Sequence, residues 1–499
     1  MLGFVRSAAC LYMKFIVKLH PEITIKSSSV RKRFTRLLES NIRVVFKHRD
    51  VDAAIKNSWD KLEIRPRNQE PEHIERMRVA LGNIPGIEQC LEVCESEYTD
   101  FDDIYQQVSK VWGPRLEGKT FAVRVKRRGK HEFKSIDVAR YVGGGLNQNF
   151  PSGGVSLHHP DIEIQLEVDK DRLLMIEDRF KGLGGMPLPT QEDVLSLISG
   201  GFDSSVASFE FIRRGAKTHY CFFNLGGRDH EIGVRQICYY LWQKYSLSHR
   251  VKFISVDFAP VVNDIVENCE SGYMGVVLKR MMLRAAEIVA DNLQIKALIT
   301  GECVGQVASQ TLTNLHVIDQ VTDKLVLRPL ICMDKSEIIK RARAIGTGDL
   351  SETIPEYCGV ISRSPNVKAS LEKTIEEEQK LNLGLIEQVV RESNVLDIRN
   401  INQVFGEEAK EIEVISSLPE NAVVLDIRAP EEEDANPLEL DNVEVKHVPF
   451  YKLERVFPEM DKDVQYYLYC DRGVMSKYHT LLLHERGYQN VHLYQPEKA

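Results

Sequence analysis

A short turn rich in glycine and serine constrains the fold more than any other feature of this sequence. The turn, Ser199–Ser205, reads S-G-G-F-D-S-S; it follows an apolar run over Val194–Ile198 and precedes a helical pattern over Val206–Arg214. Glycine lets the backbone approach an anion closely, and a helix that begins there directs free N–H groups and its positive end at that anion. The turn therefore predicts a phosphate site, although the lysine of an ordinary P-loop is missing. A glycine-serine turn without a function is the alternative.

The turn opens a region in which predicted strands and helices alternate. Further apolar runs occur at Thr218–Asn224, Val251–Val256 and Lys296–Thr300, with helical patterns between them. Strands that alternate with helices in this way indicate a parallel, doubly wound sheet. The chain of 499 residues is too long for a single core, so we expect three or four domains.

Cys470 is the second feature that predicts chemistry. It follows an apolar strand, Gln465–Tyr469, and a helical pattern over Ser476–Arg486 comes after the intervening loop. In such a turn the amide N–H groups of the loop converge on the sulfur and stabilise a thiolate or persulfide anion. A buried cysteine that simply ends a strand is the alternative interpretation.

The other cysteines give weaker signals. Ten cysteines in 499 residues do not form a disulfide scaffold, which favours a reducing cytoplasm. Cys358 lies in a segment bounded by Pro355 and Gly359, and on its own it reads as a structural thiol. Cys90 and Cys94 have a C-x3-C spacing with no second pair, so the sequence indicates no metal site.

Charge is distributed unevenly along the chain. The net charge is −8, yet Lys14–Arg67 holds fourteen Lys and Arg against six Asp and Glu, and Pro365–Asp441 holds seven against nineteen. A basic amino-terminal part on an acidic protein is typical of local nucleic-acid binding, because only the binding face must neutralise phosphates. A solvated charged surface explains the same counts equally well. No run approaches the roughly 18 apolar residues that cross a bilayer, so we expect no membrane association.

Three segments resemble known modules. The S-G-G-x-D-S turn resembles the PP-loop of ATP pyrophosphatases, and Arg328-Pro329-Leu330 with Lys335 resembles a later region of that domain, whose lysine faces the phosphates. Cys470–Ser476 resembles a rhodanese active-site loop, with Leu425–Arg428 as an earlier strand of that domain. The basic run Lys126–His131, with glycines downstream, resembles a THUMP domain, which is an RNA-binding module.

In this order the modules resemble the long form of the bacterial tRNA uracil 4-sulfurtransferases, a family of 4-thiouridine synthases. The resemblance extends from Met13 to Pro496. It implies a multidomain α/β protein with α+β amino-terminal and THUMP domains, a doubly wound parallel-sheet PP-loop domain and a small α/β rhodanese-like domain. The expected division is an extension at 1–12, a ferredoxin-like domain at 13–74, a THUMP domain at 75–179, a PP-loop domain at 180–365, a helical linker at 366–417 and a rhodanese-like domain at 418–496.

The resemblance also implies the residues of an ATP site and of an RNA face. Asp203 and Lys335 would assist adenylation of the uracil 4-oxygen, and Mg²⁺ would offset the charge of the triphosphate. The nucleotide-binding positions implied are Leu197, Ile198, Ser199, Gly200, Gly201, Ser204, Ser205, Phe222, Phe223, Lys279, Gly301 and Gln310. The RNA-binding positions implied are Lys126, Arg127, Arg128 and Lys130.

The same resemblance gives two cysteines their roles. A cysteine desulfurase would load Cys470 with a persulfide, and that sulfur, or sulfide released from it, would attack carbon 4 of uridine 8. Cys358 would then close a disulfide with Cys470, to be reduced before the next turnover. Because these cysteines are far apart in sequence, the rhodanese unit is expected to swing on a charged helical arm, Lys368–Lys380.

The expected partners are tRNA, the desulfurase and the sulfur-carrier protein of thiamine thiazole synthesis, in the cytoplasm, and a homodimer is compatible with the sequence. Two other classes of function remain open. A PP-loop amidating ligase would need neither Cys470 nor an RNA face, and an RNA-binding sulfur carrier without adenylation would not need Ser199–Ser205. Sequence also leaves open whether Met1 or Met13 begins the protein.

Overall fold

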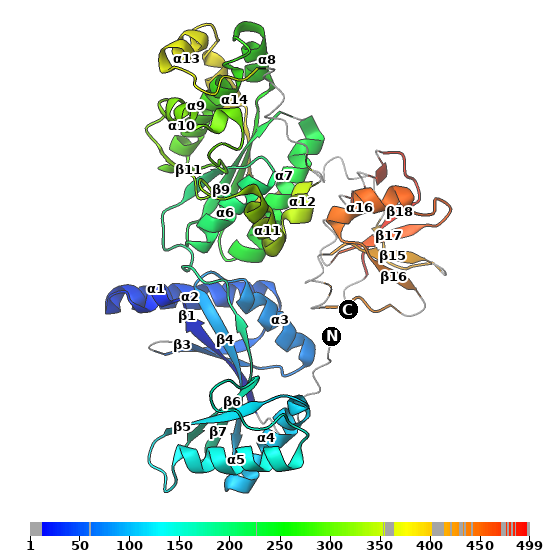
Figure 1. The fold of residues 1–499 in the computed structure, drawn as a ribbon. Helices are drawn as coiled ribbons and strands as arrows, with labels where there is room; N and C mark the ends of the chain where they lie inside the picture. Colours follow the sequence, from blue (N-terminus) through cyan, green and yellow to red (C-terminus); the bar gives the residue numbers. More distant parts are fainter. Residues whose placement is uncertain are drawn as a thin grey trace. The chain divides into compact units, whose positions relative to one another are not determined.

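The computed structural model describes residues 12–58, 61–225, 227–352, 354, 364–401, 414–419, 422–428, 433, 436–440, 443–470, 476, 479–480, 483–484 and 486–496. Contacts divide the chain into two compact units, Met1–Pro187 and Leu188–Ala499, whose elements are labelled in Figure 1. Within the described ranges, no helix combines the length and the apolar character that a bilayer crossing requires. The extension expected at 1–12 lies outside the described residues except for Tyr12, where the first strand begins.

The first unit is built on one seven-stranded sheet with the order β2-β3-β1-β4-β7-β6-β5. The strands are β1 (Tyr12–Leu19), β2 (Ala53–Asn57), β3 (Lys61–Pro66), β4 (Ile87–Glu97), β5 (Phe121–Arg128), β6 (Ile162–Asp169) and β7 (Arg172–Lys181). β4 pairs antiparallel with β1 on one side and with β7 on the other. The amino-terminal and THUMP parts, expected as separate domains, therefore share a sheet.

The α-helices described in this unit are α1 (Pro21–Thr24), α2 (Ser28–His48), α3 (Pro71–Gly82), α4 (Phe101–Trp112) and α5 (Ser135–Asn149). α2 buries Phe34, Leu38 and Ile42 on one face at helical spacing. Its Lys32 and Arg36 are exposed. The helix is therefore amphipathic, with a basic face toward solvent.

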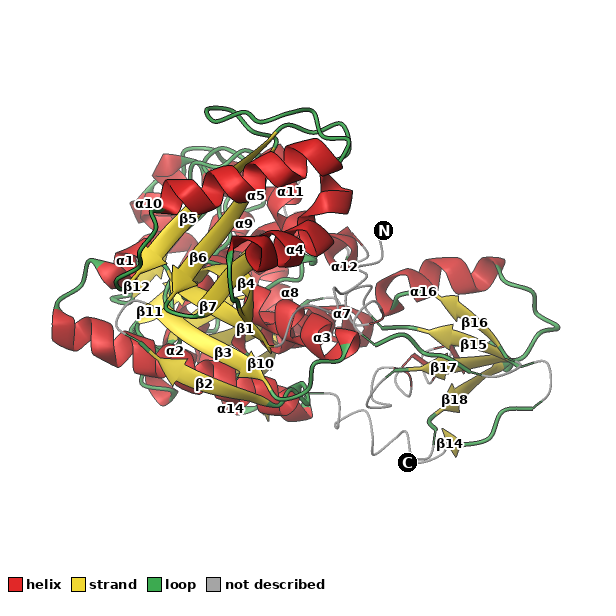
Figure 2. Cartoon of the chain, turned by 90° about the horizontal axis from the view of Figure 1, so that it is seen from below, coloured by secondary structure: helices red, strands yellow, loops and turns green. Residues whose placement is uncertain are grey.

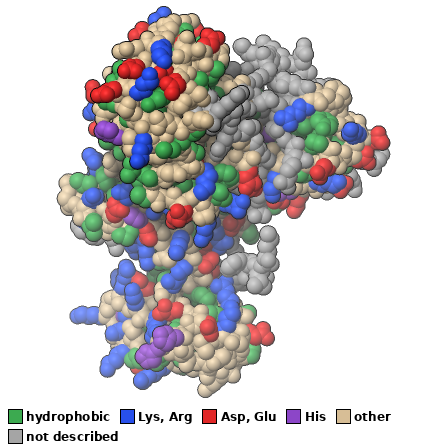
Figure 3. All heavy atoms as spheres, turned by 45° about the horizontal axis from the view of Figure 1, so that its top comes forward, with side chains coloured by type: hydrophobic (Ala, Val, Ile, Leu, Met, Phe, Trp, Pro, Cys, Tyr) green, Lys and Arg blue, Asp and Glu red, His purple; other side chains and the backbone are tan. Residues whose placement is uncertain are grey.

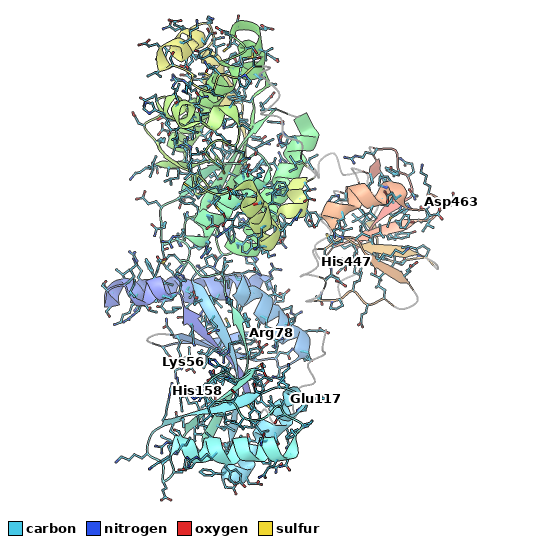
Figure 4. All side chains as sticks on the ribbon, viewed as in Figure 1. Lys56, Arg78, Glu117, His158, His447 and Asp463 are labelled. Atoms are coloured by element: carbon cyan, nitrogen blue, oxygen red, sulfur yellow. The ribbon has the colours of Figure 1, made fainter. Side chains whose placement is uncertain are left out.

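Sequence pattern alone misses β4, because two glutamates interrupt its apolar residues. Both are buried in the structure: Glu92 is 1% exposed and Glu95 is 7% exposed. Arg78 of α3, labelled in Figure 4, donates from Nη2 to Glu92 Oε2 at 2.5 Å. Lys14 and Arg172 lie 3.0 and 2.6 Å from Glu95. Ion pairs thus hold charged side chains inside the sheet, where an alternation rule expects apolar ones.

The second unit contains a six-stranded sheet with the order β12-β11-β8-β9-β10-β13. The strands are β8 (Val194–Leu197), β9 (Thr218–Asn224), β10 (Lys252–Asp257), β11 (Ala297–Ile299), β12 (Leu325–Leu327) and β13 (Asn394–Asp397). All neighbours pair in parallel except β13, which is antiparallel to β10. The doubly wound parallel sheet predicted from the alternation is confirmed.

Helices cover both faces of this sheet, as Figure 1 shows. One group comprises α6 (Phe202–Arg213), α7 (Gly227–Leu241), α11 (Lys335–Ile345) and α12 (Gly348–Glu352). The other comprises α8 (Ala259–Asn268), α9 (Met274–Asn292), α10 (Leu312–Asp319), α13 (Leu371–Glu378) and α14 (Gly384–Arg391). The second group buries an extensive apolar core against the strands, with Val277, Ala286 and Leu298 fully buried.

The expectation of a free swinging arm at Lys368–Lys380 is wrong. Most of this segment forms α13, which packs on α9: Glu378 is 4% exposed and accepts from Arg280 Nη2 at 3.1 Å and from Arg284 Nη2 at 3.2 Å. The chain then adds β13 to the sheet. The acidic run looked solvated in sequence, but two arginines of α9 compensate its charge and fix it to the PP-loop part.

The carboxy-terminal part has a five-stranded sheet with the order β14-β18-β17-β15-β16, which can be followed in Figure 2. The strands are β14 (Val414–Ile415), β15 (Val423–Asp426), β16 (Glu444–His447), β17 (Tyr466–Tyr469) and β18 (Val491–Tyr494), with α16 (Phe450–Val456) after β16. Every neighbouring pair is parallel. This is the small α/β domain that the sequence predicts around Cys470.

Candidate active site

The glycine-rich turn connects β8 to α6 in the conformation that its glycines permit. Gly200 has a φ of +87°, and a Cβ there would lie 2.7 Å from Ile354 Cδ1 and 2.9 Å from Val234 Cγ2. Gly201 is the N-cap of α6. The turn thus needs glycine at position 200 for both backbone angle and space, and it brings the backbone to the start of a helix, where anions bind.

The hydroxyl groups of this turn are used within the protein. The Ser199 N–H donates to Ser204 Oγ at 3.2 Å. Ser205 Oγ donates to the Phe202 carbonyl at 2.9 Å and lies 3.1 Å from Thr347 Oγ1. Ser205 is fully buried, at 0% exposure. Ser204 and Ser205, expected as donors to a nucleotide, therefore stabilise the shape of the turn in this structure.

The two residues expected to assist adenylation meet at this turn. Lys335, the first residue of α11, places its Nζ 3.0 and 2.8 Å from the two carboxylate oxygens of Asp203. Gln306 Nε2 donates to the same carboxylate at 3.0 Å. The side chains of Lys335 and Asp203 are 38% and 20% exposed, so the pair is open to an incoming ligand. Sequence reasoning missed Gln306, whose only signal was its place in the loop after Gly301.

Gly301 joins this turn to a second polar cluster. A Cβ at Gly301 would lie 2.6 Å from the Asp203 carbonyl carbon, so only glycine allows the two backbones this close. The next residue, Glu302, accepts from Lys279 Nζ, from Arg328 Nε at 2.8 Å and from Thr300 Oγ1 at 3.0 Å. Lys279, expected at the nucleotide, is therefore held by a carboxylate directly beside the turn.

Glu302 keeps its negative charge although it is buried. Burial alone would raise the pKa of Glu302, but the positive charges of Lys279 and Arg328 outweigh it and lower the pKa to about 2. Arg328 is held on its other side by Asp319, with nitrogen–oxygen distances of 2.9 and 2.6 Å. The cluster links β11, α9, α10 and the end of β12 through charged hydrogen bonds.

The remaining expected nucleotide positions are mostly core side chains. Phe222 is 0%, Ile198 3% and Phe223 7% exposed. Leu197 packs against the core, and Gln310 accepts from the Cys303 N–H at 3.3 Å. Contact of a nucleotide with the three buried residues would therefore use their backbone rather than their side chains.

Cys470 follows β17 directly and is 7% exposed. The Ser476 N–H donates to its Sγ at 3.3 Å, and Ser476 Oγ lies 3.3 Å from the same sulfur. The loop residues 471–475 lie outside the described residues, as does Cys358. The structure therefore confirms that Cys470 directly follows a strand, and the roles of Cys470 and Cys358 stay predictions.

A buried ion pair supports the strands beside Cys470. Asp426 and Arg428 are each 1% exposed in their side chains, with Arg428 Nη2 2.5 Å from Asp426 Oδ2. The guanidinium lies 5.1 Å from the ring centre of Tyr469. His447 of β16, labelled in Figure 4, places Nε2 3.0 Å from the Arg428 carbonyl oxygen. This pair is structural, since both charges are enclosed by the fold.

The expected RNA-binding residues lie at the exposed end of β5. Arg128 pairs with Glu167 at 2.5 Å, and Arg127 donates to the Phe133 carbonyl oxygen and lies 5.9 Å from the Phe133 ring centre. Lys126 and Lys130 are exposed. Part of the positive charge of this run is thus already compensated within the protein.

A stronger basic feature lies on α2, outside the RNA-binding positions expected from the sequence. A hollow of about 420 Å³ is lined by Ser29, Lys32, Arg33, Arg36 and Leu37. Its three cations come from two neighbouring turns of one helix, and Figure 3 shows Lys and Arg side chains gathered over the amino-terminal unit. Two signals in the sequence point to this surface: the charge count over Lys14–Arg67 and the pattern of a basic amphipathic helix over Val30–Leu38.

Four family models match the chain in the order of its parts. They are described as the ThiI ferredoxin-like domain (residues 14–90), the THUMP domain (98–178), the thiamine biosynthesis protein ThiI (189–383) and the rhodanese-like domain (408–495). The first two models fall on the two parts of the seven-stranded sheet, the third on the six-stranded sheet and the fourth on the five-stranded sheet.

Full-length relatives carry the same arrangement. The tRNA sulfurtransferase of Shewanella amazonensis is 57% identical over 97% of this chain and 100% of its own length. That of Tolumonas auensis is 55% identical with the same coverage. A crystal structure of a 4-thiouridine synthetase–RNA complex with bound ATP is 27% identical, with a TM-score of 0.67 over 77% of this chain and 99% of the other. The chain belongs to the tRNA sulfurtransferase family.

Proposed function

We propose that this enzyme uses ATP to activate the uracil 4-oxygen of uridine 8 in tRNA and then replaces that oxygen with sulfur carried by Cys470. The observation that carries the proposal is the open Asp203–Lys335 pair, 2.8 Å apart, at a glycine turn that begins a helix. A helix start with a nearby ammonium group binds phosphate oxygens. The 4-thiouridine synthetase of similar fold contains bound ATP, which supports the same ligand here.

Adenylation uses the first site. The uracil 4-oxygen attacks the α-phosphorus, the bond to the β-phosphate breaks, and pyrophosphate leaves. Lys335 stabilises the negative charge that develops on the phosphate oxygens, and the N–H groups at the start of α6 add to this effect. Glu302 holds Lys279 beside the turn, so that its ammonium group remains at the edge of the site.

Mg²⁺ fits this site as an ion that arrives with the nucleotide. In nucleotide sites Mg²⁺ binds one or two carboxylates and completes its shell with phosphates and water. The described part of the chain holds no group of three His, Cys, Asp or Glu side chains arranged as a metal cage. Asp203 is the carboxylate at the turn that would hold Mg²⁺, and the ion would offset the triphosphate charge.

Sulfur transfer uses the second site. The outer sulfur of a Cys470 persulfide attacks carbon 4, AMP leaves, and the sulfur is bonded to both the base and Cys470. The Cys358 thiolate then attacks Cys470 Sγ, which forms a Cys358–Cys470 disulfide and expels 4-thiouridine. An external reductant restores both thiols.

The position of Ile354 supports this role of Cys358. Ile354 contacts the turn, because a Cβ at Gly200 would lie 2.7 Å from its Cδ1. Cys358 follows Ile354 by four positions in the sequence. The proposed resolving thiol thus comes shortly after a residue that contacts the glycine-rich turn.

The RNA face combines the hollow of α2 with the end of β5. Lys32, Arg33 and Arg36 surround the hollow, and Lys126 and Lys130 are exposed on β5 and just after it. Cations spaced along a surface bind the phosphate backbone by shape rather than by base sequence. The desulfurase, the sulfur carrier of thiazole synthesis, the cytoplasmic location and the homodimer stay predictions of the family resemblance.

One assay separates this proposal from its two rivals. The protein is incubated with ATP, bulk tRNA, cysteine and a cysteine desulfurase, and both AMP and 4-thiouridine are measured. We expect both products, in equal amounts in a single turnover. An amidating ligase would release AMP without 4-thiouridine, and a sulfur carrier would gain a persulfide without AMP release; either result would overturn the proposal.

A further inference from the structure

Both the backbone N–H and the side-chain hydroxyl of Ser476 contact the sulfur of Cys470. Its N–H donates to Cys470 Sγ at 3.3 Å, and its hydroxyl oxygen lies 3.3 Å from the same atom. Ser476 is 0% exposed and Cys470 is 7% exposed. Water therefore has little access to replace these contacts, and a missing donor there would not be compensated by solvent.

The direction of the hydroxyl contact depends on the charge of the sulfur. In a neutral pair either the thiol or the hydroxyl can donate. A thiolate has no proton and only accepts, so the Ser476 O–H must then be the donor. A hydrogen bond to a charged group is about twice as strong as one between neutral groups, and burial strengthens it further. The contact therefore favours the thiolate over the thiol.

Ser476 is held in this position by a contact from Thr480, four residues further along the chain. Thr480 Oγ1 donates to the Ser476 carbonyl oxygen at 2.8 Å, and Thr480 is itself 0% exposed. The contact of Thr480 is with the backbone of Ser476 and not with its hydroxyl. Helix geometry and the hydroxyl donor can therefore be changed separately.

We propose that the Ser476 hydroxyl is a catalytic donor, which stabilises the Cys470 thiolate that accepts sulfur; this inference rests on the sulfur-transfer function proposed above. In the loading step the Cys470 thiolate attacks the outer sulfur of the donor persulfide. The sulfur–sulfur bond of the donor breaks, and the donor leaves as a thiolate, so that electrons and atoms balance. Ser476 increases the fraction of Cys470 present as the attacking thiolate at neutral pH.

The test compares Ser476→Ala, which keeps the N–H donor, with Ser476→Thr, which keeps the hydroxyl. The rate at which iodoacetamide alkylates Cys470 is followed by peptide mass spectrometry between about pH 5 and pH 10. For Ser476→Ala we expect a pH midpoint about one unit higher and a rate about ten-fold lower at neutral pH. Ser476→Thr should restore most of the parent rate. An unchanged profile in Ser476→Ala would overturn the inference.

Thr480→Val is the matched control, because it removes the bond to the Ser476 backbone and leaves the hydroxyl in place. We expect its alkylation profile to equal that of the parent; a shift as large as that of Ser476→Ala would assign the effect to helix geometry and overturn the donor role. The desulfurase reaction separates the two proposals. If the parent never gains a persulfide on Cys470, the proposed function fails, whereas the alkylation profile still decides the role of Ser476.

Discussion

The glycine-rich turn and Cys470 each follow a strand of a parallel sheet, β8 and β17, but the groups around them hold charge in opposite ways. At the first, Lys335 and Asp203 form an ion pair whose side chains are 38% and 20% exposed. At the second, Cys470 is 7% exposed and its sulfur contacts the neutral N–H and hydroxyl groups of Ser476. An exposed ion pair can exchange its partners for a charged ligand, whereas a buried sulfur with neutral donors holds a charge of its own. In the mechanism proposed above, one site therefore binds an anion and the other stores one.

The largest expected effect is that of Cys470→Ser, which should abolish sulfur transfer and leave adenylation intact. Cys470→Ser should reduce 4-thiouridine formation to an undetectable level, because the sulfur that carries the persulfide is gone. Release of pyrophosphate in the first turnover should remain, because adenylation precedes the sulfur attack and the Asp203–Lys335 pair is unchanged. Quantifying both products in a single turnover checks this, with Cys332→Ser as control, because Cys332 is exposed. A variant that still makes most of its 4-thiouridine would break the division between the sites.

The reverse experiment acts on the first loop. Lys335→Ala should lower AMP formation about 10²- to 10³-fold, because the developing phosphate charge loses a preorganised partner. Persulfide loading of Cys470, measured by mass spectrometry with the desulfurase, should match the parent. Lys340→Ala on the same helix is a control for substitution of a lysine. Equal losses of AMP formation and persulfide loading would show that the two loops are not independent.

The pH dependence of stability sharpens the contrast between a charged and a neutral environment. Because the pKa of Glu302 is lowered from 4.5 to about 2, its stabilising effect is present above about pH 4.5 and is lost as the pH falls toward 2. Glu302→Gln should cost on the order of 3 kcal/mol near pH 6 and progressively less below pH 4.5. Denaturant unfolding at several pH values checks this. The loss of unfolding free energy caused by Ser476→Ala should not vary over that pH range. If it varied as much as the loss caused by Glu302→Gln, the contrast between the charged cluster at Glu302 and the neutral donors at Cys470 would be wrong.

A smaller effect is expected from the shape of the first turn. Gly200→Ala should lower AMP formation about ten-fold, because the added Cβ meets Ile354 and Val234 in a backbone region unfavourable to alanine. Gly227→Ala is the matched control: its φ is +75°, yet a Cβ there has nothing within 4 Å. Steady-state AMP release with tRNA measures both. If Gly200→Ala and Gly227→Ala lowered AMP formation equally, the loss would be due to backbone strain and not to the contact with Ile354.

The smallest effect concerns RNA and should leave both loops unchanged. Replacing Lys32 and Arg36 together with Ala should lower the log–log salt slope of tRNA binding by up to about 1.8 if both contact duplex phosphates. Replacing Arg127 and Arg128 should lower it less, because Arg128 already pairs with Glu167. Titrations at several salt concentrations measure the slopes. A larger change for the β5 pair would place the main phosphate contacts at that strand instead.

The parts of the fold predicted best were those in which local pattern and tertiary surroundings agree. β9 was predicted at its observed bounds, because its residues are almost uniformly buried between two helical layers. β4 and α13 were misread because their glutamates are neutralised by arginines and a lysine distant in sequence. Residue type cannot reveal such pairing. For the same reason the sequence identified Asp203 and Lys335 but not Gln306, which reaches Asp203 from a loop 103 positions away.

The shared strand β4 has a consequence for how the protein folds. It pairs along most of its length with β1 and with β7, whose residues lie on opposite sides of it in the sequence. Neither the amino-terminal nor the THUMP part can therefore lose its sheet without exposing an edge of the other. The two parts should melt together in a single cooperative transition, and a fragment that ends between β4 and β5 should aggregate rather than fold alone.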